Sequence, residues 1–100
     1  MEKIITFVIP AYNAEPYLKK CLDSFGDTAI MDKIEVLIVN DGSSDQTVQI
    51  AQAYVKRNPG MYKLINKENG GHGSVINIGS KLASGKFIKV IDADECLLNT

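Results

Sequence analysis

Short apolar runs alternate along this chain with longer stretches in which apolar residues are spaced. The runs at residues 4–9, 34–39 and 87–91 are rich in Ile and Val and almost continuously apolar, and a weaker run covers residues 62–65. Runs of this length are typical of strands buried on both faces of a parallel sheet. The pattern therefore predicts four strands.

Apolar residues between these runs recur at spacings of three and four, which predicts an amphipathic helix after each of the first three strands. Asn13 is predicted to cap the first helix, with Pro16 in its first turn, and the "SSD" segment is predicted to cap the second. Gly85 is predicted to end the third helix in a left-handed conformation. The three apolar stripes are Tyr17, Leu18, Cys21, Leu22 and Phe25; Val48, Ala51, Tyr54 and Val55; and Val75, Ile78 and Leu82.

The order strand-helix-strand-helix-strand-helix-strand predicts an α/β fold with a mostly parallel sheet and helices on its faces, a Rossmann-like three-layer architecture. Right-handed crossovers favour the strand order 3-2-1-4. We expect residues 1–100 to form a single domain. In such sheets ligands bind beyond the carboxyl ends of the strands, here in a crevice between strands 1 and 4.

Composition narrows the function classes. The chain has 100 residues, 45% of them hydrophobic, and a formal net charge of −1. This charge gives no field that would gather nucleic acid or anionic lipid, and no apolar run is long enough to span a membrane. The N-terminus resembles a strand rather than a signal peptide, and Cys21 and Cys96 lie outside any metal-binding spacing. We therefore expect a cytoplasmic protein with two reduced cysteines.

Each predicted strand is followed by a polar, glycine-rich or acidic cluster. The four clusters read, in order, "PAYNAE", "NDGSSD", "KENGGHGS" and "DADE". Because the carboxyl ends of parallel strands meet at one edge of a sheet, all four clusters should lie together. Loops on a rigid scaffold are a common place for binding groups, so the sequence predicts a ligand site at this edge.

The chemistry of these clusters suits a nucleoside diphosphate. Tyr12 offers a ring face for stacking, and Asp41 can accept a hydrogen bond from a base N–H. The "NGGHGS" segment allows backbone N–H groups and a helix N-terminus to approach a phosphate. Asp92 and Asp94 are spaced like a DXD metal site, and carboxylates beside a diphosphate require Mg²⁺ or Mn²⁺ between them. Taken singly, each cluster can also be explained without a ligand. Asp92 and Asp94 could lie in a solvated turn, and His72 could be an ordinary loop residue.

Three segments resemble one protein family. "FVIPAYNAEPYLKKCLDSF", "EVLIVNDGSSDQT" and "NGGHGSVINIGSKLASGKFIKVIDADE" are similar to the N-terminal, nucleotide-sugar-binding half of family 2 glycosyltransferases with the GT-A fold. The resemblance covers nearly the whole chain. It implies inverting transfer of a hexose from a UDP-sugar or related donor to a glycan or lipid-linked acceptor, as in the synthesis of cell-envelope polysaccharide.

The resemblance also implies a role for each matching residue. It assigns nucleotide binding to six residues and metal binding to Asp94, with Asp41 on the base edge and Asp92 on the ribose or the metal shell. Where many relatives have an arginine, this chain has Ile76, and His72 or Lys81 could supply that phosphate contact. The nucleotide-binding residues are Pro10, Ala11, Tyr12, Asp41, Gly71 and Asp92.

The family's acceptor-binding half and its general base would lie beyond residue 100. The resemblance therefore assigns no catalytic residue to this chain, and we expect it to be inactive alone. The alternative is a non-catalytic nucleotide-binding or interaction module, which could pair as a homodimer through an exposed strand edge. A dinucleotide-binding domain is excluded because "PAYNAE" contains no glycine. If the chain is an enzyme of this family, we also expect it to associate with the inner face of the membrane.

Overall fold

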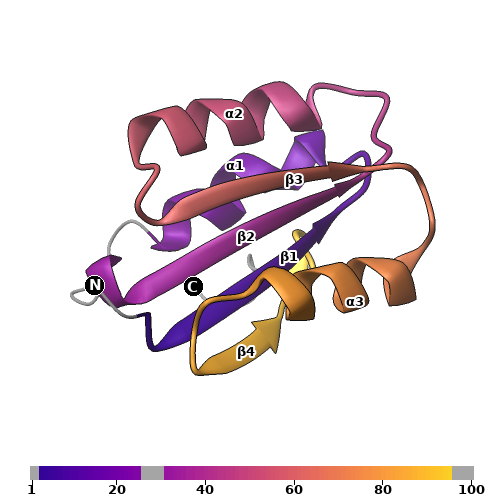
Figure 1. Ribbon diagram of the computed structural model, residues 1–100. Coiled ribbons are helices and arrows are strands. Elements are labelled where there is room, and N and C mark those ends of the chain that lie inside the picture. Colours follow the sequence, from indigo (N-terminus) through magenta and orange to yellow (C-terminus); the bar gives the residue numbers. More distant parts are fainter. Residues whose placement is uncertain (1–2, 26–30, 96–100) are drawn as a thin grey trace.

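The computed structural model describes residues 3–25 and 31–95, and these contain the predicted alternation of strands and helices (Figure 1). A short 3₁₀ helix, η1, precedes the second strand. The elements are β1 (Ile5–Ala11), α1 (Glu15–Phe25), η1 (Met31–Lys33), β2 (Ile34–Asp41), α2 (Thr47–Arg57), β3 (Tyr62–Lys67), α3 (His72–Leu82) and β4 (Phe87–Val90).

The four strands form one parallel sheet in the order β3-β2-β1-β4, which confirms the predicted topology. Ile5 at the start of β1 lies opposite Ile34 of β2 and Phe87 of β4, so these three strands start level with one another. Because every strand runs in the same direction, their carboxyl ends share one edge of the sheet. The four polar clusters therefore follow the strands at this edge, as predicted.

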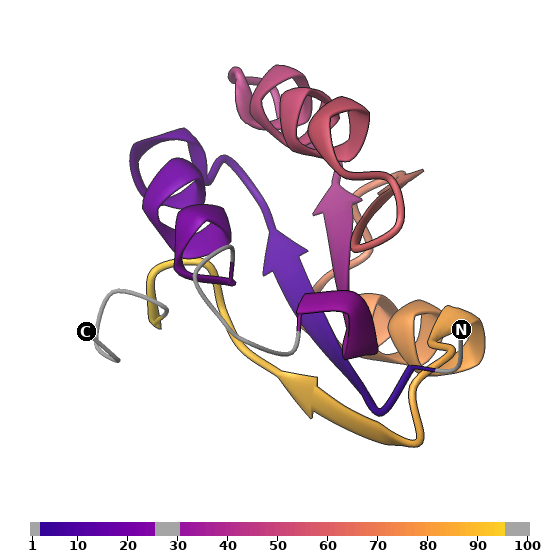
Figure 2. The same ribbon diagram turned by 90° about the vertical axis from the view of Figure 1, so that its left-hand side faces the viewer.

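Helices α1 and α2 cover one face of the sheet, and α3 covers the other (Figure 2). The alternation along the strands explains the continuous apolar runs. Ile9 and Ile38 face the layer of α1 and α2, whereas Val8 and Leu37 face Val75 of α3. Both faces of β1 and β2 are thus buried, and each fully buried aliphatic side chain stabilises the fold by about 1.5–3 kcal/mol.

Strand β4 differs from the prediction of a strand buried on both faces. It ends at Val90 rather than at residue 91, and Phe87 and Ile88 are 65% and 45% exposed. Among the described residues β4 pairs only with β1, so it lies at an edge of the sheet. Its apolar run therefore reflects its position beside β1 and does not indicate burial.

The predicted cap of α1 by Asn13 is wrong. Asn13 has a positive φ of 48°, and its Oδ1 accepts a hydrogen bond of 2.8 Å from the backbone N–H of Ser44. The first helical hydrogen bonds instead go to the carbonyl oxygen of Ala14. Asn13 therefore connects two loops, while Tyr17, which was assigned to the apolar stripe of α1, is 42% exposed.

The predicted left-handed cap at Gly85 is also wrong. The positive-φ glycines in the described chain are Gly42 and Gly71, and α3 ends at Leu82 with an extended residue after it. A Cβ at Gly85 would lie 2.6 Å from the carbonyl carbon of Ile5. Glycine is needed here because the loop between α3 and β4 passes very close to the backbone of β1.

A buried carboxylate fixes that loop. Glu35 of β2 is fully buried, and its Oε1 accepts hydrogen bonds from the Thr6 hydroxyl at 2.8 Å and the Ser84 N–H at 2.9 Å. Its Oε2 lies 2.9 Å from the Lys63 ammonium, and Thr6 accepts a further bond from the Gly85 N–H. Burial alone would raise the pKa of Glu35, but the bonds from Lys63, Ser84 and Thr6 outweigh it and lower the pKa to about 2. One carboxylate thus connects β1, β2, β3 and the loop that leads into β4.

The expectation of reduced cysteines is wrong for Cys21, which is fully buried on α1 and is disulfide-bonded. Cys96 lies outside the described residues. Within the described ranges, no helix combines the length and the apolar character that crossing a bilayer requires.

Candidate nucleotide-sugar site

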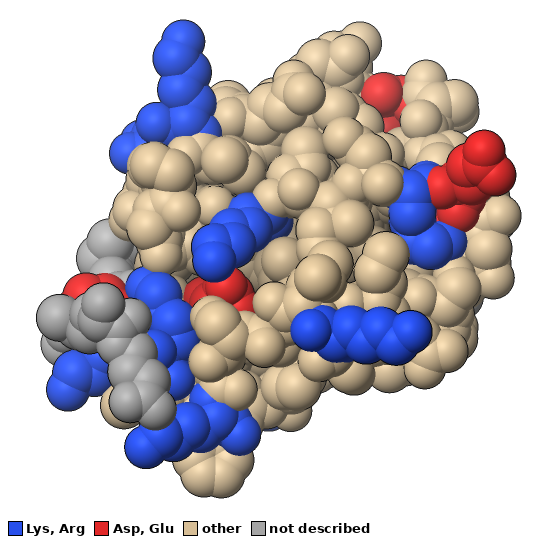
Figure 3. All heavy atoms as spheres, viewed as in Figure 1, with Lys and Arg blue, Asp and Glu red and all other residues tan. Residues whose placement is uncertain are grey.

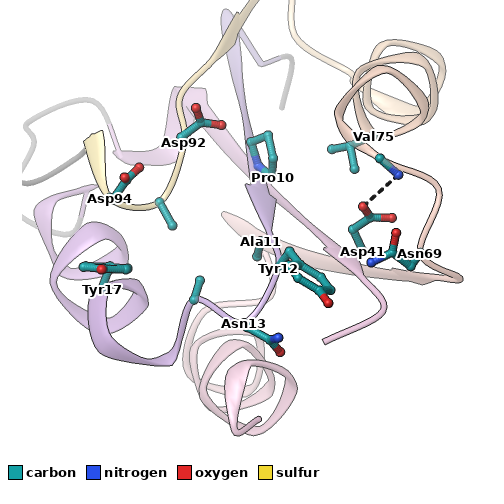
Figure 4. A pocket seen from close by; sticks show the side chains of 13 residues that line it. Pro10, Ala11, Tyr12, Asn13, Tyr17, Asp41, Asn69, Val75, Asp92 and Asp94 are labelled. Carbon is teal, nitrogen blue, oxygen red and sulfur yellow. Dashed lines mark hydrogen bonds between the residues drawn. The ribbon is translucent and has the colours of Figure 1, made fainter. Parts of the chain in front are cut away.

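A pocket of about 480 Å³ lies at the carboxyl edge of the sheet (Figure 4). It is bordered by the end of β1, the following loop and α1, by the end of β2, by the segment after β4, and by α3 and the loop before it. Its lining residues are Pro10, Ala11, Tyr12, Asn13, Ala14, Tyr17, Asp41, Asn69, Gly71, Val75, Asp92, Ala93 and Asp94.

All of the residues predicted for nucleotide and metal binding line this one pocket. Figure 4 shows Asp92 and Asp94 on one side, Asp41 and Asn69 on the other, and Tyr12 between them. Their roles stay predictions, but their proximity is a feature of the structure. Lys81, an alternative phosphate contact, is not among the lining residues, and the His72 side chain lies outside what the structure describes.

Sequence reasoning did not select the remaining lining residues: Asn13, Ala14, Tyr17, Asn69, Val75 and Ala93. Asn69 could have been found, because it stands in the same "KENGGHGS" cluster as Gly71. Tyr17 could not, because its spacing fits the apolar stripe of α1. Only the structure shows that this ring lies at the pocket rather than in the core.

Asp41 is buried at the end of β2 and is held by the segment that follows β3. Its Oδ1 accepts hydrogen bonds from the Lys67 ammonium at 2.8 Å and the Gly70 N–H at 2.9 Å, and its Oδ2 accepts one from the Gly71 N–H at 3.1 Å. The hydrogen bond from Lys67 is the largest cause that lowers the pKa of Asp41, and it outweighs the opposing effect of burial. Asp41 is therefore an ionised acceptor at the pocket wall.

The loops after β1 and β2 are joined by reciprocal polar contacts. The backbone N–H of Asn13 donates to Ser43 Oγ at 2.9 Å, while Asn13 Oδ1 accepts from Ser44. The Asp45 carboxylate accepts from the N–H of Glu15 in α1, and the Glu15 carboxylate accepts from the N–H of Gln46 before α2. These bonds fix the loop that carries Tyr12 relative to β2. The Tyr12 side chain is itself 56% exposed, so its ring is accessible to a ligand.

The start of α3 lacks the shared carboxylate found at the other two helices, since Asp45 accepts hydrogen bonds from the first turns of α1 and α2. In α3 the N-cap is Gly71, with a φ of 87°. As in α2, the N-cap of α3 makes no side-chain cap bond and the first turn has no acidic residue. The backbone N–H groups at this end carry a partial positive charge and border the pocket, which favours an anion beside them.

The segment after β4 turns two carboxylates toward the pocket. Ala93 is buried in the core layer of α1 and α2, so its neighbours Asp92 and Asp94 point away from that core. Asp94 is exposed and Asp92 is partly buried. No cluster of three or more metal-ligating side chains occurs among the described residues. The donor set suits Mg²⁺ or Mn²⁺, since such ions are commonly held by one or two carboxylates together with substrate phosphates.

The fold and the pocket define the class of protein. The three-layer fold with a parallel sheet in the order 3-2-1-4 matches GT-A glycosyltransferase structures. The family model described as "Glycosyl transferase family 2" matches residues 6–99. The chain belongs to this family.

Individual relatives agree with this assignment. The chain is 37% identical over 95 residues to "Uncharacterized glycosyltransferase EpsJ" of Bacillus subtilis, covering 95% of this chain and 27% of EpsJ. It is also similar to the mannosyltransferase PcManGT from Pyrobaculum calidifontis, which was solved with GDP-Man and Mn²⁺. The TM-score is 0.84 and the identity 26%, over 94% of this chain and 28% of PcManGT.

A third relative is S. aureus TarS 1-349, solved in complex with UDP-GlcNAc. The TM-score is 0.81 and the identity 34%, over 91% of this chain and 26% of the TarS chain. The chain thus spans about a quarter of the length of each of these relatives.

Proposed function

We propose that this chain binds a nucleotide-diphospho-sugar together with Mn²⁺ or Mg²⁺, and that it forms the donor-binding part of an inverting hexosyltransferase. The observation that carries the proposal is the shared pocket, in which an accessible aromatic ring, an ionised acceptor, an uncapped helix N-terminus and two carboxylates meet. A UDP-sugar is the simplest donor to test, because TarS was solved with UDP-GlcNAc. PcManGT was solved with GDP-Man and Mn²⁺, which supports a divalent cation at the site.

The base lies at the end of the pocket formed by β1 and β2. The Tyr12 ring stacks on the base, and such aromatic contacts contribute about 0.5–1.5 kcal/mol beyond the area they bury. Asp41 accepts a base N–H, and Pro10 and Ala11 line the same end. An ionised carboxylate can only accept hydrogen bonds, so this end selects a base edge that presents an N–H.

The diphosphate lies between the start of α3 and the two acids. The space beside Gly71 is open, since a Cβ at this position would meet nothing within 4 Å, so the diphosphate can approach the backbone N–H groups in the first turn of α3. Asp94 holds the cation, and Asp92 contacts the ribose or the cation's shell. When bound, the cation neutralises the charge that develops on the leaving diphosphate.

In the complete reaction, an acceptor hydroxyl oxygen bonds to the anomeric carbon as the bond from that carbon to the diphosphate breaks. A general base takes up the hydroxyl proton, and the configuration at the carbon inverts. We assign that base, and the binding of a glycan or lipid-linked acceptor, to the part of the relatives that this chain does not span. Transfer by this chain alone is therefore expected to be negligible.

The second candidate is a non-catalytic nucleotide-binding or interaction module. It is favoured by the open edge of β4, where the exposed Phe87 and Ile88 could contact another chain. Both candidates predict negligible sugar transfer by the chain alone, but an interaction module does not require nucleotide binding. Sugar transfer measured with the chain alone would exclude the non-catalytic module and would also contradict the assignment of the base above.

Calorimetric titration of UDP-GlcNAc with Mn²⁺, and again with EDTA, tests the proposal. We expect Mn²⁺ to tighten binding and Asp94→Asn to remove this gain, because the substitution removes the charge that attracts the cation. Asp32→Asn, at an exposed acid of η1 outside the pocket, is the matched control and should keep the gain. Binding that is equally tight with and without metal would contradict the role of Asp94, and absence of binding would contradict the function.

A further inference from the structure

An ion pair between Lys67 and Asp41 connects β3 to the candidate nucleotide site. Lys67 is the last residue of β3 and lies opposite Asp41, the last residue of β2, in the strand register. Its ammonium donates to Asp41 Oδ1 at 2.8 Å and to the carbonyl oxygen of Glu68 at 2.6 Å. Both side chains are largely removed from solvent, with exposures of 14% for Lys67 and 8% for Asp41. A pair at this depth is much less screened than a surface ion pair.

The hydrogen bonds on Asp41 leave limited room for a ligand. A carboxylate has about four acceptor positions. Lys67 and Gly70 use both positions on Oδ1, and Gly71 uses one on Oδ2. Among the contacts of the described residues, one position on Oδ2 is therefore left for a base N–H. It is useful only while the carboxylate is ionised, because a protonated acid would present a hydrogen to the base N–H.

We propose that Lys67 is a positioning residue of the nucleotide site: without touching the nucleotide, it keeps Asp41 ionised and oriented so that one oxygen can accept the base N–H. This inference rests on the proposed function, because it concerns the same pocket. It adds a residue on β3, outside the pocket lining, that sets the lower pH limit of nucleotide binding.

The Gly70 and Gly71 N–H groups also favour the ionised form of Asp41, because they donate to its carboxylate. The remaining groups around Asp41 do not favour ionisation. Burial disfavours the charged form, and the acids Asp92 and Asp94 line the same pocket on its other side. Tyr12 contributes a neutral ring from the β1 loop, and Glu68 is an exposed acid next to Lys67. Within the described part of the chain, Lys67 is the charged side chain that contacts the Asp41 carboxylate. Removing it should therefore raise the pKa of Asp41.

The test compares Lys67→Met and Lys67→Arg with the unmodified chain. The probe is UDP-GlcNAc in EDTA, titrated calorimetrically from about pH 4 to pH 8; its diphosphate is a diester and does not titrate in this range. Lys20→Met, at an exposed lysine of α1 outside the pocket, is the matched control. In parallel, the amide resonances of Gly70 and Gly71 report the ionisation of Asp41 by NMR without any ligand.

With Lys67→Met, we expect the loss of affinity relative to the unmodified chain to grow as the pH falls, approaching tenfold per pH unit once Asp41 is protonated. The midpoint of the Gly70 and Gly71 titrations should move to higher pH, while Lys67→Arg and Lys20→Met keep the original profile. A loss that is equal at every pH, or an unmoved NMR midpoint, would overturn the proposal and reduce Lys67 to a structural role. If the unmodified chain binds no UDP-GlcNAc in EDTA, the nucleotide role of Lys67 fails, and a raised NMR midpoint would then show only the ion pair's effect on Asp41. The proposed function fails only if binding is also absent with Mn²⁺.

Discussion

Glu35→Gln tests whether the buried carboxylate network stabilises the sheet through charge. Glutamine has nearly the same shape as glutamate and can still accept the hydrogen bond from the Ser84 N–H. It cannot form an ion pair with Lys63, whose ammonium lies 2.9 Å from Oε2. The substitution therefore removes the charge of this network while leaving its packing almost unchanged.

The size of the effect follows from the pKa of Glu35, which is lowered from 4.5 to about 2. At 1.36 kcal/mol per pH unit, this difference corresponds to about 3 kcal/mol of folding free energy. Lys63 is half exposed, so solvent screens its share, and a measured value nearer 2 kcal/mol is consistent with the same reasoning. Because the folded-state pKa is depressed, this stability is fully present above about pH 4.5 and is lost as the pH falls through about 2.

Urea unfolding followed by circular dichroism measures this contribution. We expect Glu35→Gln to be less stable than the unmodified chain by about 2–3 kcal/mol at pH 7, and the difference should shrink steadily between about pH 4.5 and pH 2. Glu68→Gln, at an exposed acid, is the control and should change stability by less than about 0.5 kcal/mol at either pH. A Glu35→Gln difference that is the same at pH 7 and pH 2 would refute the reasoning.

Three further predictions concern single positions. Gly85→Ala should destabilise the chain by about 1–3 kcal/mol, because its Cβ would overlap the β1 backbone. Gly73→Ala in α3 is the control: its Cβ would meet nothing within 4 Å, so the change should be neutral or stabilising by about 0.5–1 kcal/mol. Thermal unfolding of both variants checks this, and equal shifts in unfolding temperature would contradict it. Asp45→Ala should cost about 1–2 kcal/mol in the same assay, because its carboxylate accepts hydrogen bonds at the starts of both α1 and α2. Tyr12→Leu should weaken UDP-GlcNAc binding in calorimetry while leaving the unfolding temperature almost unchanged, since the ring is 56% exposed; a variant that unfolds earlier and binds normally would show that the ring serves the fold instead.

The topology of the sheet could be predicted because it follows from short stretches of the sequence and from general rules of connection. Apolar runs bounded by turn residues define the strands, and the handedness of crossovers leaves few possible orders. The same dependence on short stretches explains the error at β4. Phe87 and Ile88 have the composition of a buried strand, but their exposure depends on which elements lie beside them, and the pattern along one strand does not contain that information.

The sequence predicts which loops meet at the pocket, but it does not predict the individual contacts between their side chains. Asn13 has the side chain of a helix cap, yet its partner is Ser44, 31 positions away. Gly85 has the position of a helix end, yet it is required by the backbone of β1. Lys67 begins the "KENGGHGS" cluster, but its role could not be predicted, because a lysine at the end of a strand usually faces solvent. Only the register between β2 and β3 places it against Asp41.

Charge is distributed unevenly over the face shown in Figure 3, where lysine and arginine side chains outnumber acidic ones. Among the acids of the chain, Asp41, Asp92 and Asp94 line the pocket at the carboxyl edge of the sheet. An anionic diphosphate at this edge would meet repulsion from carboxylates unless a cation lies between them. The placement of the diphosphate between α3 and these acids therefore depends on a bound cation.

Paramagnetic broadening by Mn²⁺ tests this dependence most directly. In an NMR titration with UDP-GlcNAc present, Mn²⁺ should broaden the amide resonances of Gly71, Ala93 and Asp94 well before those of β3, and Asp94→Asn should abolish the effect. Broadening centred elsewhere on the chain, or broadening that Asp94→Asn leaves unchanged, would contradict a metal-bridged diphosphate in this pocket.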